Sequence, residues 1–288
     1  MLGILEAIEN WIKEILIGAI ESNLSSMFGD VNEKVGTIAV QVGTTPAGWN
    51  INIFNMIRTL SETVIMPIAG IIITYVLCYE LITMVTEKNS FHDNVDTFMF
   101  FKYFFKAWAA VFIVAHTFDI TMAVFDMAQH VISNAAGVIH GSTAIDIDAA
   151  IAAMDLAAYG IPELLLLMIE TFLVSFCLKI MGIIITVILY GRMIEIYLTC
   201  SVAPIPLATM TNKEWGQTGN NFLRGLLALG FQGFFLMLCV GIYAVLVNEM
   251  VITDNVHTAI FSVAAYTVLL CAAMMKAGSL AKSVFGAS

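Results

Sequence analysis

Long apolar segments separated by short polar ones are the main pattern along the chain. Five of these segments have the length and composition of membrane spans, at about 64–86, 103–125, 162–190, 223–247 and 257–275. Each approaches the roughly 20 apolar residues that an α-helix needs to cross about 30 Å of hydrocarbon. The pattern therefore predicts an all-α fold, a polytopic transmembrane helical bundle with about five full spans.

The N-terminal segment has a different pattern. Apolar residues recur at three- and four-residue steps with glutamates between them, at Leu5, Ile8, Ile12, Ile15, Leu16, Ile20, Leu24 and Met27. This spacing predicts an amphipathic helix over 1–28. Two placements are open for it: packed on neighbouring helices, or lying in the membrane interface, where Trp11 would fit.

Residues 29–63 are more polar than the spans. Gly43 and Pro46 favour a turn there, so we expect a loop and a short helix outside the bilayer core. The chain would then consist of an extracytoplasmic region at 1–63 and a transmembrane domain at 64–288.

A shorter apolar segment follows the third predicted span. Only Gly191 and Arg192 separate the two, and Met193 to Ala203 would make about 16 Å of helix, half a bilayer. Pro204 and Pro206 remove backbone donors and stop a helix. We therefore predict a re-entrant or half-spanning segment at 193–208.

A polar loop at 209–222, here called the hook, comes next. It carries Lys213, Glu214, Trp215 and Gly216, and Arg224 follows it. The fourth span then has small residues that allow close helix packing, at Gly230, Gly233 and Gly241.

Charges inside the third span mark a candidate functional region. Glu170 and Lys179 are nine residues apart, which places them on opposite faces of a helix. Because charge inside a membrane is costly, each needs a partner on another helix or a wet cavity. They indicate a translocation path or subunit interface that also includes Arg192 and Glu195, or else a private structural pair.

A second polar set lies at the far end of the second span. His116, Asp119, Asp126 and His130 would form one stripe on a helix. A metal site needs such side chains to converge, so the stripe is more typical of a solvated or interhelical face.

The distribution of positive charge predicts the topology. Lys88, Lys102, Lys106, Arg192, Lys213, Arg224, Lys276 and Lys282 can share one side if 193–208 enters and returns on that side. The loops at 126–161 and 248–256 contain no Lys or Arg. Basic short loops stay cytoplasmic, so we expect a multi-pass membrane protein with its N-terminus outside and its C-terminus inside.

Composition limits the chemistry. The chain is 60% hydrophobic and 12% charged with a net charge of −10, which argues against a basic nucleic-acid-binding surface but not against a channel. The five cysteines have no metal or redox spacing. The sequence contains no phosphate-binding loop, no nucleophile elbow and no H-E-x-x-H motif, so we predict no catalysis, no cofactor and no metal.

One family resemblance emerges from the region after the third span. The segments S-V-A-P-I-P-L-A at 201–208, E-W-G-Q-T-G-N-N-F-L-R at 214–224 and G-F-Q-G-F-F at 230–235 resemble the TrbL-like family. Its members are polytopic inner-membrane subunits of type IV secretion and conjugation machines, and the likeness is greatest to forms on conjugative elements of Gram-positive bacteria. Pro204, Pro206, Trp215, Gly216, Arg224 and Gly233 match the family pattern.

The resemblance implies a non-enzymatic channel or scaffold subunit. Such a subunit of the bacterial cytoplasmic membrane would help pass single-stranded DNA with its bound relaxase. It would assemble as a homo-oligomer, with a five-fold ring as one form. Its partners would be other secretion subunits, cytoplasmic ATPases and the lipid bilayer. Two alternatives are a secondary transporter or ion channel, and an assembly scaffold that does not touch substrate.

Overall fold

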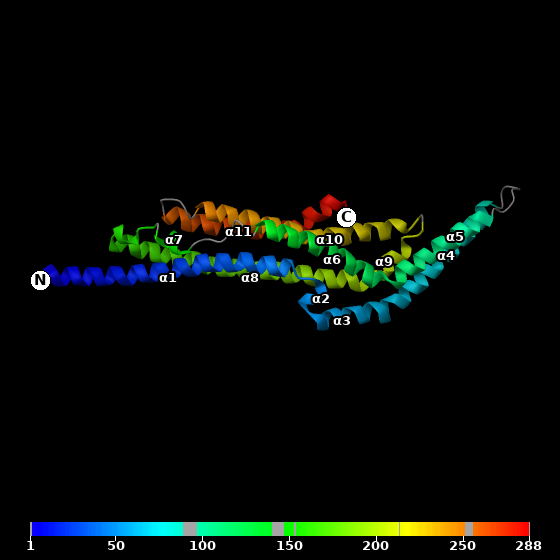
Figure 1. Cartoon of the computed structure of the whole chain (residues 1–288), viewed down its shortest axis with the longest axis horizontal. Helices are drawn as coiled ribbons and strands as arrows, with labels where there is room; N and C mark the ends of the chain where they lie inside the picture. Colours follow the sequence, from blue (N-terminus) through cyan, green and yellow to red (C-terminus); the bar gives the residue numbers. More distant parts are fainter. Residues whose placement is uncertain are drawn as a thin grey trace. The chain divides into compact units, whose positions relative to one another are not determined.

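The computed structural model describes residues 2–88, 97–139, 147–152, 154–212, 214–250 and 256–287 (Figure 1). Every regular element in these ranges is a helix, which confirms the all-α prediction. Four helices are long and apolar enough to cross a membrane, or five spans are present if one bent pair of helices counts as one. The structure thus agrees with a polytopic bundle of about five spans.

The helices follow one another in simple order. They are α1 (Leu2–Val42), α2 (Pro46–Trp49), α3 (Ile51–Leu60), a π-helix (Ser61–Ile65), α4 (Met66–Lys88), α5 (Thr97–Ala115), α6 (Thr117–Ile139), α7 (Ile147–Ala152), a 3₁₀-helix (Leu156–Ala158), α8 (Ile161–Val202), α9 (Pro204–Thr209), α10 (Gly216–Met250) and α11 (Val256–Phe285).

The expectation of a loop over most of 29–63 was wrong. Helix α1 continues to Val42, because a buried apolar stripe at three- and four-residue steps extends past Met27 to Val31, Val35 and Ile38. The chain is non-helical only around 43–45 and at Asn50. Asn50 caps α3, since its side-chain oxygen accepts hydrogen bonds from the backbone N–H groups of residues 52 and 53 at 3.0 Å.

The first two spans also differ from their predicted limits. The first begins earlier, because α3, the π-helix and α4 form one helical stretch over Ile51–Thr86. The second is broken at His116, where α5 and α6 meet at a bend of 70°. A threonine follows the break, and the Thr117 hydroxyl donates to the carbonyls of Ile113 and Val114, two carbonyls next to the bend.

The predicted half-span at 193–208 is not a separate element. Residues 193–202 continue α8, a helix of 42 residues and about 63 Å. A glycine inside a helix costs only about 1 kcal/mol, so Gly191 does not end it. Burial of Met193, Ile196 and Tyr197 in a hydrophobic core stabilises the continuation. Pro204 instead occupies the first turn of α9, where no backbone donor is needed.

The other predicted boundaries also shift, because the helices continue beyond the apolar runs. The expected external loop at 126–161 is partly helical, because α6 runs to Ile139 and α7 follows. The second half of the hook belongs to α10, which begins at Gly216, and α11 extends ten residues past the predicted end at 275. Polar residues next to an apolar run often continue its helix, so hydropathy marks the span and not the helix end.

The chain divides into two compact units. Unit 1 contains Met1–Gly43, Ile132–Tyr190 and Phe234–Ala277, and its core joins the buried faces of α1, α8, α10 and α11. Unit 2 contains Thr44–Val131, Gly191–Gly233 and Gly278–Ser288, and has two smaller cores. In unit 2, α9 packs against both α4 and α5.

Candidate functional site

The predicted acidic residue of the third span has a partner on another helix. In unit 1, Glu170 of α8 lies 2.5 Å from Nδ1 of His257, at the start of α11. Their side chains are 18% and 35% exposed. A carboxylate and an imidazole this close share a hydrogen bond, which offsets the cost of placing the acid among apolar helices. The structure thus fits the expectation that Glu170 needs an interhelical partner.

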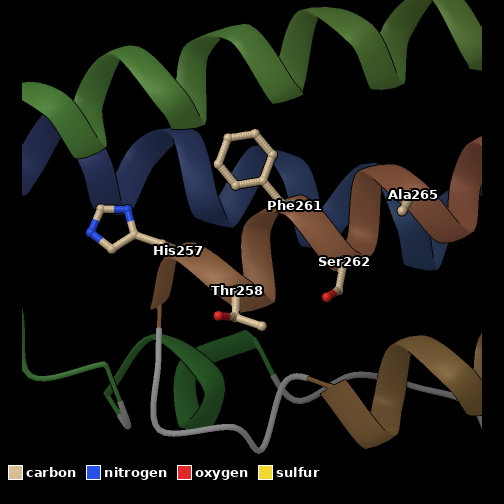
Figure 2. Close-up of a pocket in the computed structure, with 5 residues that line it drawn as sticks. All are labelled: His257, Thr258, Phe261, Ser262 and Ala265. Atoms are coloured by element: carbon tan, nitrogen blue, oxygen red, sulfur yellow. The ribbon is translucent and has the colours of Figure 1, made fainter.

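His257 also borders a hollow of about 460 Å³. The residues that line it are His257, Thr258, Phe261, Ser262 and Ala265, all of α11. Figure 2 shows that His257 and Phe261 leave the helix on a different side from Thr258 and Ser262.

The predicted basic residue of the third span lies apart from this pair. Lys179 is exposed, and none of the ion pairs found among the described residues includes it. Its exposed neighbours Phe176 and Ile180 are apolar. Glu170 and Lys179 therefore do not form a private pair, and Lys179 is available to a partner outside the chain.

A lysine of α1 contacts the same part of α8. The Lys34 ammonium donates a hydrogen bond of 2.7 Å to the Leu178 carbonyl. The Lys34 side chain fits there because Gly182 has no side chain: a Cβ at Gly182 would lie 2.7 Å from Cε of Lys34. This contact places a cation in the interface between α1 and α8 of unit 1.

Arg192 and Glu195 lie close together in unit 2 but make different contacts. Arg192 is 7% exposed and donates a weak hydrogen bond of 3.4 Å to the Gly230 carbonyl, while its buried Nε has no partner. Glu195 is half-exposed and lies 3.8 Å from Nζ of Lys282. Arg192 is therefore a packing residue between α8 and α10, whereas Glu195 forms a surface ion pair.

The hook folds onto α4 within unit 2. The Trp215 ring stacks on the rings of Tyr75 and Tyr79, at centroid distances of 5.6 and 6.1 Å. The Tyr79 hydroxyl donates to the Glu214 carboxylate at 3.3 Å. Asn212 caps the turn by accepting from the backbone N–H of residues 214 and 215. The hook residue Lys213 lies outside the described residues.

Two glycines allow the hook its close turn. A Cβ at Gly216 would lie 2.8 Å from the Met210 carbonyl oxygen, and one at Gly219 would lie 2.7 Å from the Pro206 carbonyl oxygen. Both contacts are with backbone atoms, so a side chain at either position would displace α9 from α10. Pro206 thus forms part of this turn, together with the start of α9 at Pro204.

The glycines of the fourth span are buried, and one has a clear role. Gly230 lies against α6, because a Cβ added at Gly230 would lie 3.2 Å from Cβ of Ala128. Gly233 and Gly241 are also buried, whereas Arg224 at the start of this helix is exposed.

The polar stripe of the second span does not act as one site. The bend at His116 separates this residue from the other three, and all four side chains are exposed. Asp119 lies 3.3 Å from Arg58 of α3. Within the described ranges no group of three His, Cys, Asp or Glu side chains could hold a metal ion.

Four partners in these contacts were not predicted: Lys34, Arg58, His257 and the Tyr75–Tyr79 pair. Sequence gives a signal only for the tyrosines, whose four-residue spacing places both rings on one face of a helix. Lys34 and His257 are single polar residues far along the chain from their partners, so only tertiary packing could identify them.

Comparison with known proteins supports a family assignment. The family described as TrbL/VirB6 plasmid conjugal transfer like protein matches residues 31–204, more than half of the chain. The match covers the end of α1 and the chain from α2 to α8, so it lies mainly upstream of the hook segments that suggested the resemblance. Curated proteins and solved structures give no match. On this basis the chain belongs to the TrbL/VirB6 plasmid conjugal transfer like family, and is a multi-pass membrane protein of the type IV secretion and conjugation class.

Proposed function

We propose that this chain is a channel or scaffold subunit of a conjugation machine, without catalysis of its own. It helps single-stranded DNA and its bound relaxase cross the cytoplasmic membrane, and it works as a homo-oligomeric ring with other secretion subunits and cytoplasmic ATPases. The observation that carries this proposal is the family match, which includes the helix that bears Glu170, Lys179 and Arg192. Polar groups on spanning helices are typical of paths and subunit interfaces.

Lys179 is the residue most directly open to a test. It is exposed on α8 beside the apolar side chains Phe176 and Ile180, so its surroundings are lipid, a neighbouring subunit or a translocation path. A charged side chain in lipid is costly, and this favours a position at a subunit interface or on the path.

Replacing the lysine should therefore impair the machine. We expect Lys179→Leu to lower conjugative transfer by about tenfold or more, because a charged contact in an apolar interface would be lost. The protein level in the membrane should be unchanged. Lys179→Arg keeps the charge and is the matched control. Wild-type transfer by the leucine variant would reject the role of Lys179.

Transfer and crosslinking together separate a channel from a scaffold. A deletion strain complemented with the gene measures whether transfer depends on the chain. A photoreactive residue at position 179 that captures the transiting strand would support direct contact. Dependence of transfer on the chain without any capture would favour a scaffold that does not touch DNA.

A further inference from the structure

The contact between α8 and α10 in unit 2 contains a buried cation with few hydrogen bonds. Arg192 of α8 is 7% exposed, and a guanidinium has five N–H donors. One of them makes the weak 3.4 Å contact with the Gly230 carbonyl, and the buried Nε has no partner among the described residues. Because an unpaired buried charge is costly, Arg192 is suited to an anionic partner.

The acid closest to Arg192 along α8 does not supply this partner in the structure. Glu195 lies about one turn after Arg192 and acts on it electrostatically. Its carboxylate is half-exposed and lies 3.8 Å from Nζ of Lys282 on α11. None of the ion pairs within the described ranges joins Glu195 to Arg192. The charge of Arg192 is therefore not balanced by a direct contact there.

The ends of α10 and α11 that belong to unit 2 pack together beside this residue. The rings of Phe231 on α10 and Phe285 on α11 lie 5.1 Å apart. Arg224 of α10 lies near the end of α11, because a Cβ at Gly286 would lie 3.7 Å from its Nη1. Lys282 is about one turn before Phe285. These contacts bring basic side chains from three helices into one region of unit 2.

This region is basic although the whole chain is acidic. The unit 2 parts of α8, α10 and α11 are residues 191–202, 216–233 and 278–285. Their charged residues are three bases, Arg192, Arg224 and Lys282, and one acid, Glu195, whereas the whole chain has a net charge of −10. Such a local excess of positive charge attracts anions.

Large apolar side chains are exposed on the same helix ends. They are Ile194, Leu198 and Val202 on α8, and Leu280 and Val284 on α11, with exposed fractions between 44% and 62%. A nucleic-acid strand would meet the cations but leave these apolar side chains uncovered. A phospholipid covers both, because its phosphate is attached to acyl chains. Basic pockets between spanning helices on the cytoplasmic side bind acidic lipid headgroups.

We propose that Arg192, Arg224 and Lys282 bind the phosphate group of an anionic phospholipid, whose acyl chains cover the exposed apolar side chains of α8 and α11. A guanidinium binds phosphate through two parallel hydrogen bonds, and Arg192 gives up one weak contact to do so. Lys282 exchanges its ion pair with Glu195 for the phosphate. The predicted orientation places these residues on the cytoplasmic side, where anionic lipids are found. The inference does not rest on the conjugation role.

Lipid titration of the purified full-length chain in detergent tests the site. Native mass spectrometry measures its affinity for anionic phosphatidylglycerol and for zwitterionic phosphatidylcholine. We expect phosphatidylglycerol to bind about tenfold more tightly or better. Lys282→Gln and Arg224→Gln should each weaken its binding by about fivefold. Arg192→Gln should weaken it by about tenfold or more, because the two parallel hydrogen bonds are lost.

Two further variants separate this site from general surface charge. Lys102→Gln removes an exposed positive charge from α5 and should leave the affinity for phosphatidylglycerol unchanged. Glu195→Gln removes the acid that competes with phosphate for Lys282, and should tighten binding by about threefold. Lys282 and Arg224 are exposed, so their variants carry the test if Arg192→Gln does not fold.

Several results would overturn the proposal. Equal affinity for the two lipids, or equal losses in Lys282→Gln and Lys102→Gln, would show a general attraction between the protein and anionic lipid. Displacement of phosphatidylglycerol by inorganic phosphate would indicate a site for free anions. A single-stranded oligonucleotide that binds more tightly than the lipid, and is weakened by Lys282→Gln, would indicate a nucleic-acid site. Conjugative transfer is measured separately, so its presence or absence leaves these outcomes unchanged.

Discussion

At the scale of single residues, polar groups among the apolar helices differ in how fully their hydrogen-bonding capacity is satisfied. Glu170 has an imidazole partner, Lys34 has a backbone carbonyl, and Arg192 has a weak carbonyl contact with one buried nitrogen left without a partner. A buried unsatisfied donor costs about 1–3 kcal/mol. Arg192 is therefore the least stable of the three arrangements in this chain.

The Glu170–His257 contact should appear as a coupling energy. We expect Glu170→Leu and His257→Leu each to lower thermal stability in detergent, and the double variant to lose less than the sum, with a coupling of about 1–3 kcal/mol. The reason is that one substitution leaves the other polar group without its partner. Thermal unfolding of the four proteins measures the coupling.

A nearby acid gives the control for this cycle. Glu163 lies on the same helix but accepts a hydrogen bond from the Gly160 N–H at 2.9 Å. Glu163→Leu combined with His257→Leu should be additive within about 0.5 kcal/mol. Additivity in the Glu170 cycle as well would show that the contact does not stabilise the fold.

At the scale of elements, the turn between α9 and α10 depends on backbone approach. The proline-rich α9 packs on α4 and α5, and the stacked Trp215 ring fixes the hook to α4. Each such aromatic pair contributes about 0.5–1.5 kcal/mol beyond its buried area. The hook is therefore a packed element of unit 2.

Adding one methyl group should disturb this turn. In Gly219→Ala, the new Cβ would lie 2.7 Å from the Pro206 carbonyl oxygen and 2.8 Å from Cβ of Met210. We expect a loss of about 1–3 kcal/mol from overpacking, measured as a lower unfolding temperature in detergent.

Gly225→Ala on the same helix is the matched control. A Cβ there meets nothing within 4 Å, so this change should be neutral or stabilise the helix by up to about 1 kcal/mol. Equal effects of the two substitutions would contradict the close turn.

At the scale of the whole molecule, the continuous α8 changes the argument for topology. If α8, α10 and α11 each cross the membrane once, the hook and the C-terminus share a side without any re-entrant segment. The basic residues Arg192, Lys213, Arg224 and Lys282 then remain on that side. The predicted orientation, with the C-terminus inside, keeps its basis in the positive-inside rule.

Reporter fusions test this orientation. Fusions after Asn212 and after Ser288 should both report the cytoplasm, and a fusion after Ala158, ahead of α8, should report the outside. Activity of the Asn212 and Ser288 fusions on opposite sides would contradict single crossings by α10 and α11.

The sequence by itself determined the helical class, the positions of the apolar spans and the presence of charges inside them. These properties are local: a hydrophobic run of membrane length is helical whatever its neighbours are, because the backbone must satisfy its own hydrogen bonds in lipid. The family resemblance was also contained in the sequence.

Only the tertiary structure decided where helices continue, bend and find partners. Burial of Met193, Ile196 and Tyr197 stabilises the continuation of α8 past Gly191, where the sequence predicted a break. The 70° bend lies at His116, where the sequence has no proline or glycine. The partner of Glu170 lies 87 residues away in His257. Such contacts depend on which helix faces meet in three dimensions, and no local pattern of residues contains that information.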